Sequence, residues 1–281
     1  MPELPEVQTV CTAMDRVLTG RTITHVALHR DGVRTPFPAG LGQHLTKRVV
    51  SSVTRRAKYI VVNLNDGQVL LIHLGMSGRI NINFPADDYI PAKHDHMVIT
   101  FDDGKHMVFN DARRFGMVYL LPTPDLDALP SLAALGPEPL DKAFTGKVLE
   151  AALAGKNTDI KAALMDQRVV AGLGNIYVCE ALFYAGINPK RKASTIKGDE
   201  AKRLRDEIQR VLKAAIKAGG STLRDYRQAS GELGYFQHNF GVYDRVGKAC
   251  PGCTCDIKKT GGIDRIVQAG RSTFFCARKQ G

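Results

Sequence analysis

Apolar residues recur at helical spacing close to the start of the chain. Between residues 5 and 18 they fall three or four positions apart, at Val7, Val10, Cys11, Met14, Val17 and Leu18. This spacing predicts an amphipathic helix, for which Gly20 is a suitable stop. Pro5 suits the first helical turn, because a residue there has no intrahelical N–H bond to lose. The opening residues therefore lie directly before a helix N-terminus.

After Gly20 the pattern becomes that of strands. Residues 21–30 alternate, residues 47–64 are rich in β-branched side chains, and two pairs of apolar runs surround the Asp-Gly dipeptides at 66–67 and 103–104. An Asp-Gly pair between two such runs is the strongest short-range signal of a β-hairpin. Residues 20–122 are therefore predicted to form an antiparallel β-sandwich or a flattened barrel.

A proline-dense segment, residues 120–140, predicts the connection to a second part of the chain. Helical patterns follow it at residues 146–155, 159–167, 175–186 and 198–219. A Gly- and Ser-rich segment, residues 219–241, separates these helices from a cysteine-rich end. The whole chain is thus predicted to be an α+β protein of several domains.

The net charge points to a class of partner. The chain has 39 Lys and Arg against 28 Asp and Glu, so 39 − 28 gives +11, and the pI is about 9.4. Such a balance favours binding to a phosphate polymer, although a basic surface without a partner is the alternative. No apolar run approaches the ~20 residues that span a bilayer, and the start lacks the pattern of a signal peptide. We therefore expect a cytoplasmic protein.

Four cysteines gather near the end of the chain, at Cys250, Cys253, Cys255 and Cys276. In an intracellular protein this clustering favours metal chelation over disulfides. Residues 261–276 read as two short strands around Ala269 and Gly270, the arrangement of a zinc ribbon. Lys279 stands where a second C-x₂-C pair would place its last thiolate, which makes Cys255 the candidate for the fourth ligand. The alternative is a metal-free hairpin with free thiols.

Three further motifs are weak when taken alone. Residues 171–183 contain Gly-x-Gly but lack a third glycine and a preceding strand, so a dinucleotide site is rejected. They predict instead a turn between helices that presents backbone N–H groups to a phosphate, with Asn175 capping the second helix and also able to donate to the phosphate, although a cap alone is the alternative. "NDARRFG" and "HLGMSG" place Arg113, His73 and Met76 where they suit contacts with a base stack or phosphate, although core packing is the common alternative.

The residues before the first helix suggest chemistry. Removal of Met1 would leave Pro2 with a secondary amine, and an α-amino group has a pKa of ~8 against ~10.4 for lysine. A helix N-terminus lowers such a pKa further, while the carboxylate of Glu3 opposes this effect. A neutral secondary amine attacks a masked aldehyde to form an iminium, and Glu3 is placed to move protons. An ordinary trimmed terminus is the alternative.

Eight short motifs occur in order over nearly the whole chain: "MPELPEV", "RRAKY", "HLGMSG", "KHDH", "RRFG", "LGPEPL", "GLGNIY" and "GRSTFFC". This series resembles the bacterial formamidopyrimidine-DNA glycosylases, which remove 8-oxoguanine and formamidopyrimidines from DNA. "PELPEV" favours this branch over endonuclease VIII, which typically opens with PEGPE. The resemblance implies a helix and β-sandwich over residues 1–130, a helix–two-turn–helix domain with a lesion-capping loop over 131–230, and a zinc-finger hairpin over 231–281.

The resemblance also implies roles for individual residues. The catalytic positions are Pro2 as the Schiff-base nucleophile, Glu3 as acid and base, Lys58 in β-elimination and Arg271 in δ-elimination. The positions that contact DNA or fill the gap of the flipped base are His73, Met76, His94, Arg113, Phe115, Lys156 and Asn175. The lesion pocket is formed by Glu6, Leu223, Arg224 and Tyr226. One structural Zn²⁺ is expected on Cys250, Cys253, Cys255 and Cys276, where Cys255 compensates for Lys279.

The expected partner is therefore double-stranded DNA with oxidised bases or abasic sites, bound by a monomer in the bacterial cytoplasm near the nucleoid. No redox cofactor is required by this chemistry. Two alternatives stay open: a glycosylase of the same scaffold for oxidised pyrimidines, and a protein that binds lesions without catalysis. A zinc-dependent transcription regulator is a weaker alternative, because it does not explain the N-terminus.

Overall fold

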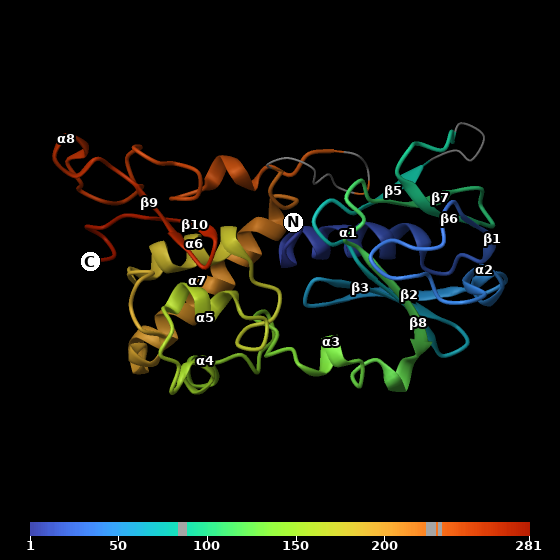
Figure 1. Cartoon of the computed structure of the whole chain (residues 1–281), viewed down its shortest axis with the longest axis horizontal. Helices are drawn as coiled ribbons and strands as arrows, with labels where there is room; N and C mark the ends of the chain where they lie inside the picture. The colour runs from blue at the N-terminus through green and yellow to red at the C-terminus, as the bar shows by residue number, and fades with distance from the viewer. Residues whose placement is uncertain (84–88, 223–228, 230–231) are drawn as a thin grey trace. The chain divides into compact units, whose positions relative to one another are not determined.

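The structure is a computed structural model of the 281-residue chain, and it describes residues 1–83, 89–222, 229 and 232–281 (Figure 1). The chain divides into two units. The first comprises Met1–Ala133 with Ala218–Tyr235, and the second comprises Ala134–Lys217 with Phe236–Gly281. The boundary after Ala133 falls inside the proline-dense segment. The three-part division at residues 130 and 230 stays a prediction.

One helix and two antiparallel sheets make up most of the first unit. Helix α1 extends over Leu4–Leu18, as the apolar spacing predicts. The strand order is β1-β6-β7-β5 in one sheet and β2-β3-β4-β8 in the other. The strands are β1 (Ile23–Leu28), β2 (Val50–Arg56), β3 (Tyr59–Leu64), β4 (Gln68–His73), β5 (Arg79–Asn83), β6 (Asp95–Phe101), β7 (His106–Asn110) and β8 (Met117–Pro122). The predicted β-sandwich preceded by a helix is confirmed.

The turns and the core of this unit follow from the sequence. Both Asp-Gly pairs form hairpin turns, in which Gly67 and Gly104 have a φ of 77° that favours glycine. The core is formed by α1 and both sheets, and includes Val7, Met14, Ile60, Leu70, Met97 and Phe109. Three short elements complete the unit: α2 (Leu41–Leu45), the 3-10 helix η2 (Thr123–Asp125) and α3 (Pro130–Ala133). The sheets thus form a rigid support for the loops at their edges.

Helices dominate the second unit. They are α4 (Gly146–Leu153), α5 (Ile160–Met165), α6 (Asn175–Ala185), α7 (Gly198–Lys217), and the 3-10 helices η3 (Ala193–Thr195) and η4 (Phe236–Asn239). Helix α6 is buried on nearly every side, since Tyr177, Glu180 and Phe183 are all inaccessible to solvent. Helix α7 packs against α4 and α6. The turn between α5 and α6 matches the predicted helix–turn–helix.

The end of the chain forms the predicted hairpin, drawn in red in Figure 1. Strands β9 (Asp264–Gln268) and β10 (Arg271–Phe275) pair antiparallel and follow the short helix α8 (Ile257–Thr260). Ala269 and Gly270 connect the strands with φ values of 48° and 70°, the conformation of a two-residue type I′ turn.

Among the described residues, no helix combines the length and apolar character needed to cross a bilayer.

Candidate functional site

Two buried carboxyl groups organise the start of α1. Glu3 is the N-cap residue, and its side chain and that of Glu6 form a capping box, with the Glu3 N–H donating to Oε2 of Glu6 at 2.8 Å. Glu3 is 4% exposed and Glu6 is 2% exposed. The positive end of the helix dipole favours both carboxylates here. Pro2 and Glu3 are thereby joined to a fixed helix end.

Glu6 also connects the helix to a segment far away in the chain. Its Oε1 accepts the backbone N–H of Ser221 at 2.8 Å. Ser221 lies two residues before the first of the predicted lesion-pocket residues Leu223, Arg224 and Tyr226, which lie outside the described residues. One carboxylate therefore holds both the N-terminus and the beginning of the segment predicted to cover the lesion.

Lys58 lies on a tight connection between β2 and β3. The residue before it, Ala57, has a φ of 51°, and its carbonyl accepts Nη1 of Arg55 at 2.9 Å. Nε of the same arginine donates to Oε1 of Gln8 on α1 at 3.0 Å. Lys58 is only 6% exposed. The arginine thus fixes the connection, and with it Lys58, against the helix.

His73, at the end of β4, is held in its neutral form. Burial, and then the positive charges of Lys58 and Arg34, lower the pKa of His73 to about 4. Its Nδ1 accepts the backbone N–H of Gly75 at 3.1 Å, so the ring proton lies on Nε2. The ring also lies 4.7 Å from that of Tyr59. At neutral pH His73 therefore acts as an uncharged hydrogen-bond donor.

A pocket of about 740 Å³ in the first unit brings several predicted residues together. It is lined by Met1, Val33, Arg34, His73, Gly75, Met76, Arg113, Arg114 and Phe115. Met76 is 38% exposed and Phe115 is 40% exposed, although both are apolar. The guanidinium of Arg113 lies 4.9 Å from the centre of the Phe115 ring. Arg34 was not found from the sequence, since no local pattern distinguishes it from other surface arginines.

A buried aspartate supports this pocket. Asp111 accepts the Ser77 hydroxyl at 2.6 Å and the Gly116 N–H at 2.8 Å, while the Ser77 oxygen accepts the Arg113 N–H at 3.0 Å. The Asp111 N–H donates to the carbonyl of His94 at 3.0 Å, so the predicted DNA contact His94 is attached to the same loop. These bonds fix the loop that carries Arg113 and Phe115 against the loop that carries Met76.

In the second unit, Asn175 does not act as the predicted helix cap. The N-cap of α6 is Gly174, and the side chain of Asn175 makes no capping bond. Instead its Nδ2 donates to the Ser272 carbonyl at 2.9 Å and lies 3.5 Å from the hydroxyl of Tyr243. Its Oδ1 is buried and has no hydrogen-bond partner among the described residues. The prediction of a cap was wrong because the side-chain amide of Asn175 binds Ser272 on the β9–β10 hairpin instead.

Asn175 thus binds Ser272, the residue that follows Arg271. Arg271 is the first residue of β10 and is exposed. Gln167 supports the preceding turn, because its side chain accepts the Gly172 N–H at 2.9 Å and donates to the Leu173 carbonyl at 2.8 Å. Lys156 lies in the same unit, in the loop after α4, and is partly exposed. Like Arg34, Tyr243 was not found from the sequence, because it lies 68 positions from Asn175.

The four predicted cysteines converge. Their sulfur atoms all lie within 4.8 Å of one another, with Sγ–Sγ distances of 3.3 Å from Cys276 to Cys250 and Cys255, and 3.8 Å to Cys253. Four thiolates at ~2.3 Å from one Zn²⁺ in tetrahedral geometry are separated by about 3.8 Å, so the cluster fits this ion. The ammonium of Lys279 lies 4.2 Å from the Phe183 ring centre instead. In the described part of the chain, this is the one such group of potential ligands.

Comparison with known proteins agrees with this geometry. The family model of the formamidopyrimidine-DNA glycosylase N-terminal domain matches residues 1–118, and that of the H2TH domain of the same enzymes matches residues 135–227. Formamidopyrimidine-DNA glycosylases of Rhodospirillum rubrum and Rhodospirillum centenum are 54% identical over 280 residues and 51% identical over 290 residues, each covering 100% of both chains.

Solved structures show the same likeness. Wild-type Lactococcus lactis Fpg, in complex with DNA containing N7-benzyl-Fapy-dG, has a TM-score of 0.88 and 32% identity over 99% of both chains. The same enzyme in complex with DNA containing an abasic site has a TM-score of 0.88 and 33% identity over 99% of both chains.

Proposed function

Because this chain belongs to the formamidopyrimidine-DNA glycosylase family, we propose that it removes oxidised purines from DNA and then cleaves the resulting abasic site. The relatives crystallised with formamidopyrimidine and abasic-site DNA support this substrate class. The observation that carries the proposal is the pocket of the first unit. Met1, directly before Pro2, lines it together with His73, Met76, Arg113 and Phe115. The nucleophile Pro2 and the side chains that fill the gap in the base stack would thereby share one site.

The chemistry requires that Met1 be removed and that Pro2 provide a secondary amine. Its nitrogen forms a bond to C1′ of the damaged nucleotide, and the base leaves with the electron pair of the glycosidic bond and a proton. The nitrogen then passes its proton to the Glu3 carboxylate, and the nitrogen lone pair expels O4′, to which Glu3 returns the proton, to give an iminium. The capping box holds Glu3 at the start of α1, directly after Pro2 in the chain, which supports these roles.

The iminium makes elimination possible. Loss of a proton from C2′ expels the 3′ phosphate, a second elimination expels the 5′ phosphate, and water then releases the sugar fragment and frees Pro2. Lys58 is proposed to assist the first elimination and Arg271 the second. Lys58 lies on a fixed, buried connection close enough to influence the pKa of His73, which supports its place in this site.

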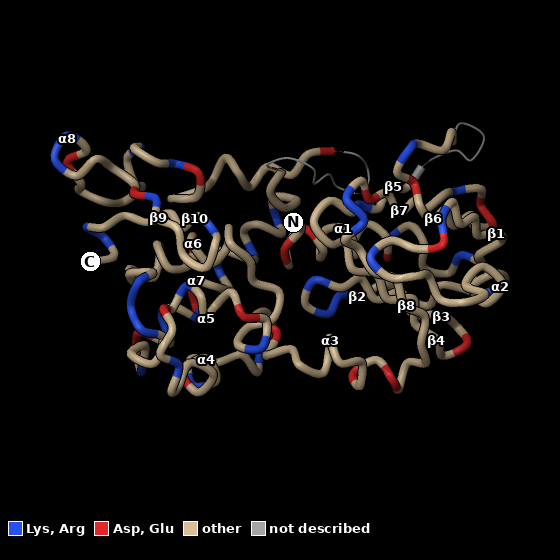
Figure 2. The backbone as a smooth tube through the Cα atoms, in the orientation of Figure 1, with Lys and Arg blue, Asp and Glu red and all other residues tan. Residues whose placement is uncertain are grey.

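Binding is proposed to rely on phosphate contacts and on extrusion of the lesion. Lys and Arg residues occur along both units, interspersed with acidic residues, so the charge of +11 does not arise from one tail (Figure 2). His73, His94, Lys156, Asn175 and Arg271 are the proposed phosphate contacts. Met76, Arg113 and Phe115 would fill the gap in the base stack, for which the exposure of the two apolar side chains provides support.

Borohydride trapping tests this mechanism. Duplex DNA with one 8-oxoguanine, incubated with the protein and borohydride, should give a covalent adduct, and Pro2→Gly should sharply reduce base excision. Intact-mass measurement should first confirm that Met1 is absent. Binding of lesion DNA without any adduct would reject the mechanism and favour a lesion-binding protein, and excision of thymine glycol in preference to 8-oxoguanine would favour the pyrimidine branch.

We propose that the cysteine cluster holds one structural Zn²⁺, which supplies no catalytic chemistry and joins the loop of residues 250–255 to the end of β10. Metal analysis should find one zinc per chain. Cys255→Ala should reduce this content strongly, and the double variant Cys255→Ala with Lys279→Cys should restore it, because it rebuilds the C-x₂-C pair usual in the family. A full zinc content in Cys255→Ala alone would refute the proposed ligand set.

A further inference from the structure

The hairpin that carries Arg271 makes contacts with the helical part of its unit that involve no cysteine. Nε2 of Gln268, at the end of β9, donates to the Pro189 carbonyl at 3.2 Å. The carbonyl of Ser272 on β10 accepts the side chain of Asn175 at 2.9 Å. These bonds attach both strands to the beginning of α6 and to the segment that follows it. The position of the hairpin is therefore not determined by the cysteine cluster alone.

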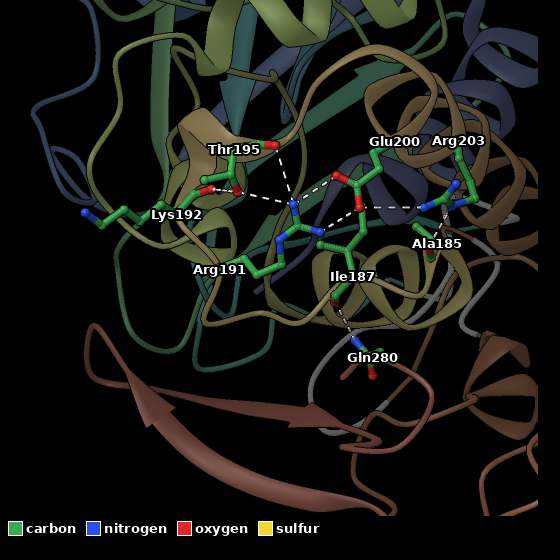
Figure 3. A network of polar contacts seen from close by, with 8 residues as sticks. All are labelled: Ala185, Ile187, Arg191, Lys192, Thr195, Glu200, Arg203 and Gln280. Atoms are coloured by element: carbon green, nitrogen blue, oxygen red, sulfur yellow. Dashed lines mark hydrogen bonds and ion pairs between the residues drawn. The ribbon is translucent and has the colours of Figure 1, made fainter.

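Gln280 provides the most buried of these attachments. Its side chain is 1% exposed, its Oε1 accepts the Cys276 N–H at 2.8 Å, and its Nε2 donates to the Ile187 carbonyl at 2.9 Å. The Gln280 N–H donates in turn to the Cys276 carbonyl at 3.0 Å. The Gln280 carboxamide thus binds both the Cys276 N–H, just after β10, and the Ile187 carbonyl, just after α6. Figure 3 shows its bond to Ile187.

The segment that receives Gln280 is itself fixed. Nε of Arg203 on α7 donates to the Ala185 carbonyl at 2.9 Å. Glu200 lies between this arginine and Arg191, whose guanidinium donates to it at 2.6 and 2.9 Å (Figure 3). The end of α6 is therefore joined to α7 by the side chain of Arg203, and Gln280 attaches the hairpin to the segment that follows directly.

Lys279 adds a second attachment next to Gln280. Its ammonium lies 4.2 Å from the centre of the Phe183 ring and 5.5 Å from that of Tyr184, both on α6. A cation at this distance from an aromatic face is attracted to it. The backbone N–H of Lys279 points at Sγ of Cys276 at 3.5 Å. The residue that replaces the usual cysteine therefore contacts a helix of the second unit.

We propose that Gln280 and Lys279 are positioning residues, which hold β10 and its Arg271 in place independently of the metal. Three of the four thiols belong to residues 250–255 and only Cys276 belongs to the hairpin side. Removal of the metal should therefore release the loop of residues 250–255 and leave β10 attached to α6. The consequence for DNA rests on the proposed function, since it takes Arg271 as a phosphate contact.

Hydrogen exchange of the full-length protein tests the attachment without DNA. The amide of Cys276, which is bonded to Gln280, and those of β10 should stay protected in wild type after treatment with a chelator. In chelated Gln280→Ala, and to a smaller extent in Lys279→Met, this protection should fall at least tenfold, while Arg278→Ala should resemble wild type. Arg278 is the matched control, because it is exposed and its side chain has no hydrogen bond, ion pair or ring contact among the described residues. Loss of protection in chelated wild type equal to that in chelated Gln280→Ala would overturn the proposal.

A double-mutant cycle tests the consequence for DNA. Affinity for a duplex with a tetrahydrofuran abasic analogue is measured for wild type, Arg271→Ala, Gln280→Ala and the double variant. Loss of a charge-assisted contact corresponds to roughly tenfold to hundredfold in affinity, so Arg271→Ala should show a loss of this size. Gln280→Ala should weaken binding less, and the double variant should bind as Arg271→Ala does, because Gln280 acts through Arg271.

The outcomes separate the two proposals. Additive losses in the double variant would show that Gln280 does not act through Arg271, and would overturn the positioning role. A wild-type protein without affinity for lesion DNA would refute the proposed function, whereas the exchange measurement would still decide whether Gln280 and Lys279 hold β10. Gln280→Glu, which keeps the acceptor for Cys276 and loses the donor to Ile187, gives a second test if Gln280→Ala fails to fold, with intermediate protection expected.

Discussion

Replacing Glu6 by glutamine exchanges one oxygen for an amino group in a side chain that joins two segments of the first unit. The carboxylate accepts the Glu3 N–H and the Ser221 N–H, each at 2.8 Å. In glutamine an NH₂ group replaces one of the two oxygens. One of the two backbone N–H groups then faces another donor instead of an acceptor. The residue is 2% exposed, so water does not replace the lost partner.

The magnitude follows from these bonds. A hydrogen bond to a charged group contributes about 1.5–3 kcal/mol, and a carboxylate near a helix N-terminus adds ~0.3–1 kcal/mol. We therefore expect Glu6→Gln to lower the free energy of unfolding of the first unit by roughly 2–4 kcal/mol. Thr12→Ala, an exposed change on the same helix, should alter it by less than ~0.5 kcal/mol.

The same change should slow the chemistry. Because Glu6 holds the N–H of Glu3, loss of this bond displaces Glu3 and the adjacent nitrogen of Pro2, and a displacement of ~1 Å costs on the order of 100-fold in rate. Urea unfolding gives the free energy, and single-turnover excision of 8-oxoguanine gives the rate. The reasoning would be refuted by a Glu6→Gln protein with the wild-type free energy of unfolding and the wild-type rate.

Three further outcomes are expected. His73 should show no NMR titration between pH 5.5 and 8, because folding lowers its pKa from the ordinary 6.5 to about 4. The stability that the neutral ring provides should therefore be complete above pH 6.5, and urea unfolding should show that it disappears as the pH falls toward 4. Glu180→Gln should lower the free energy of unfolding by roughly 2–4 kcal/mol, since Glu180 is fully buried and accepts the N–H groups of Gly241, Val242 and Tyr243. Gly75→Ala should lower the melting temperature and the affinity for abasic-site DNA, because Gly75 has a φ of 62° and a Cβ there would lie 2.4 Å from the carbonyl carbon of Phe115.

Elements defined by local patterns could be predicted from the sequence. The apolar spacing before Gly20 predicts α1, which the structure places at Leu4–Leu18. The Asp-Gly pairs and the pair Ala269 and Gly270 predict hairpins that the structure contains. These features depend on the periodicity of one segment or on the φ values that a turn requires, so neighbouring residues carry the information.

Contacts between distant segments could not be predicted in the same way. Asn175 was expected to cap α6 because asparagine favours caps, but its amide donates to Ser272, 97 positions away. Glu180 lies in a run that reads as apolar, and its role becomes visible only when residues 241–243 reach it. Arg34 likewise reaches the pocket through the arrangement of the sheets.

The cysteine cluster illustrates how a change at one position of the chain is compatible with an unchanged attachment elsewhere. Cys253 and Cys255 are half-buried while Thr254 between them is exposed, so the two thiols face the same side and Cys255 needs no rearrangement of the hairpin to reach the cluster. Cys276, at the end of β10, contributes the fourth thiol of the cluster. Because Gln280 attaches the turn after Cys276 to the segment that follows α6, and Lys279 contacts α6 itself, a lysine at position 279 is compatible with the attachment of the strand. The thiols of residues 250–255 and the contacts of Gln280 and Lys279 thus lie on different segments, and under our two proposals the first would bind the metal while the second would hold Arg271.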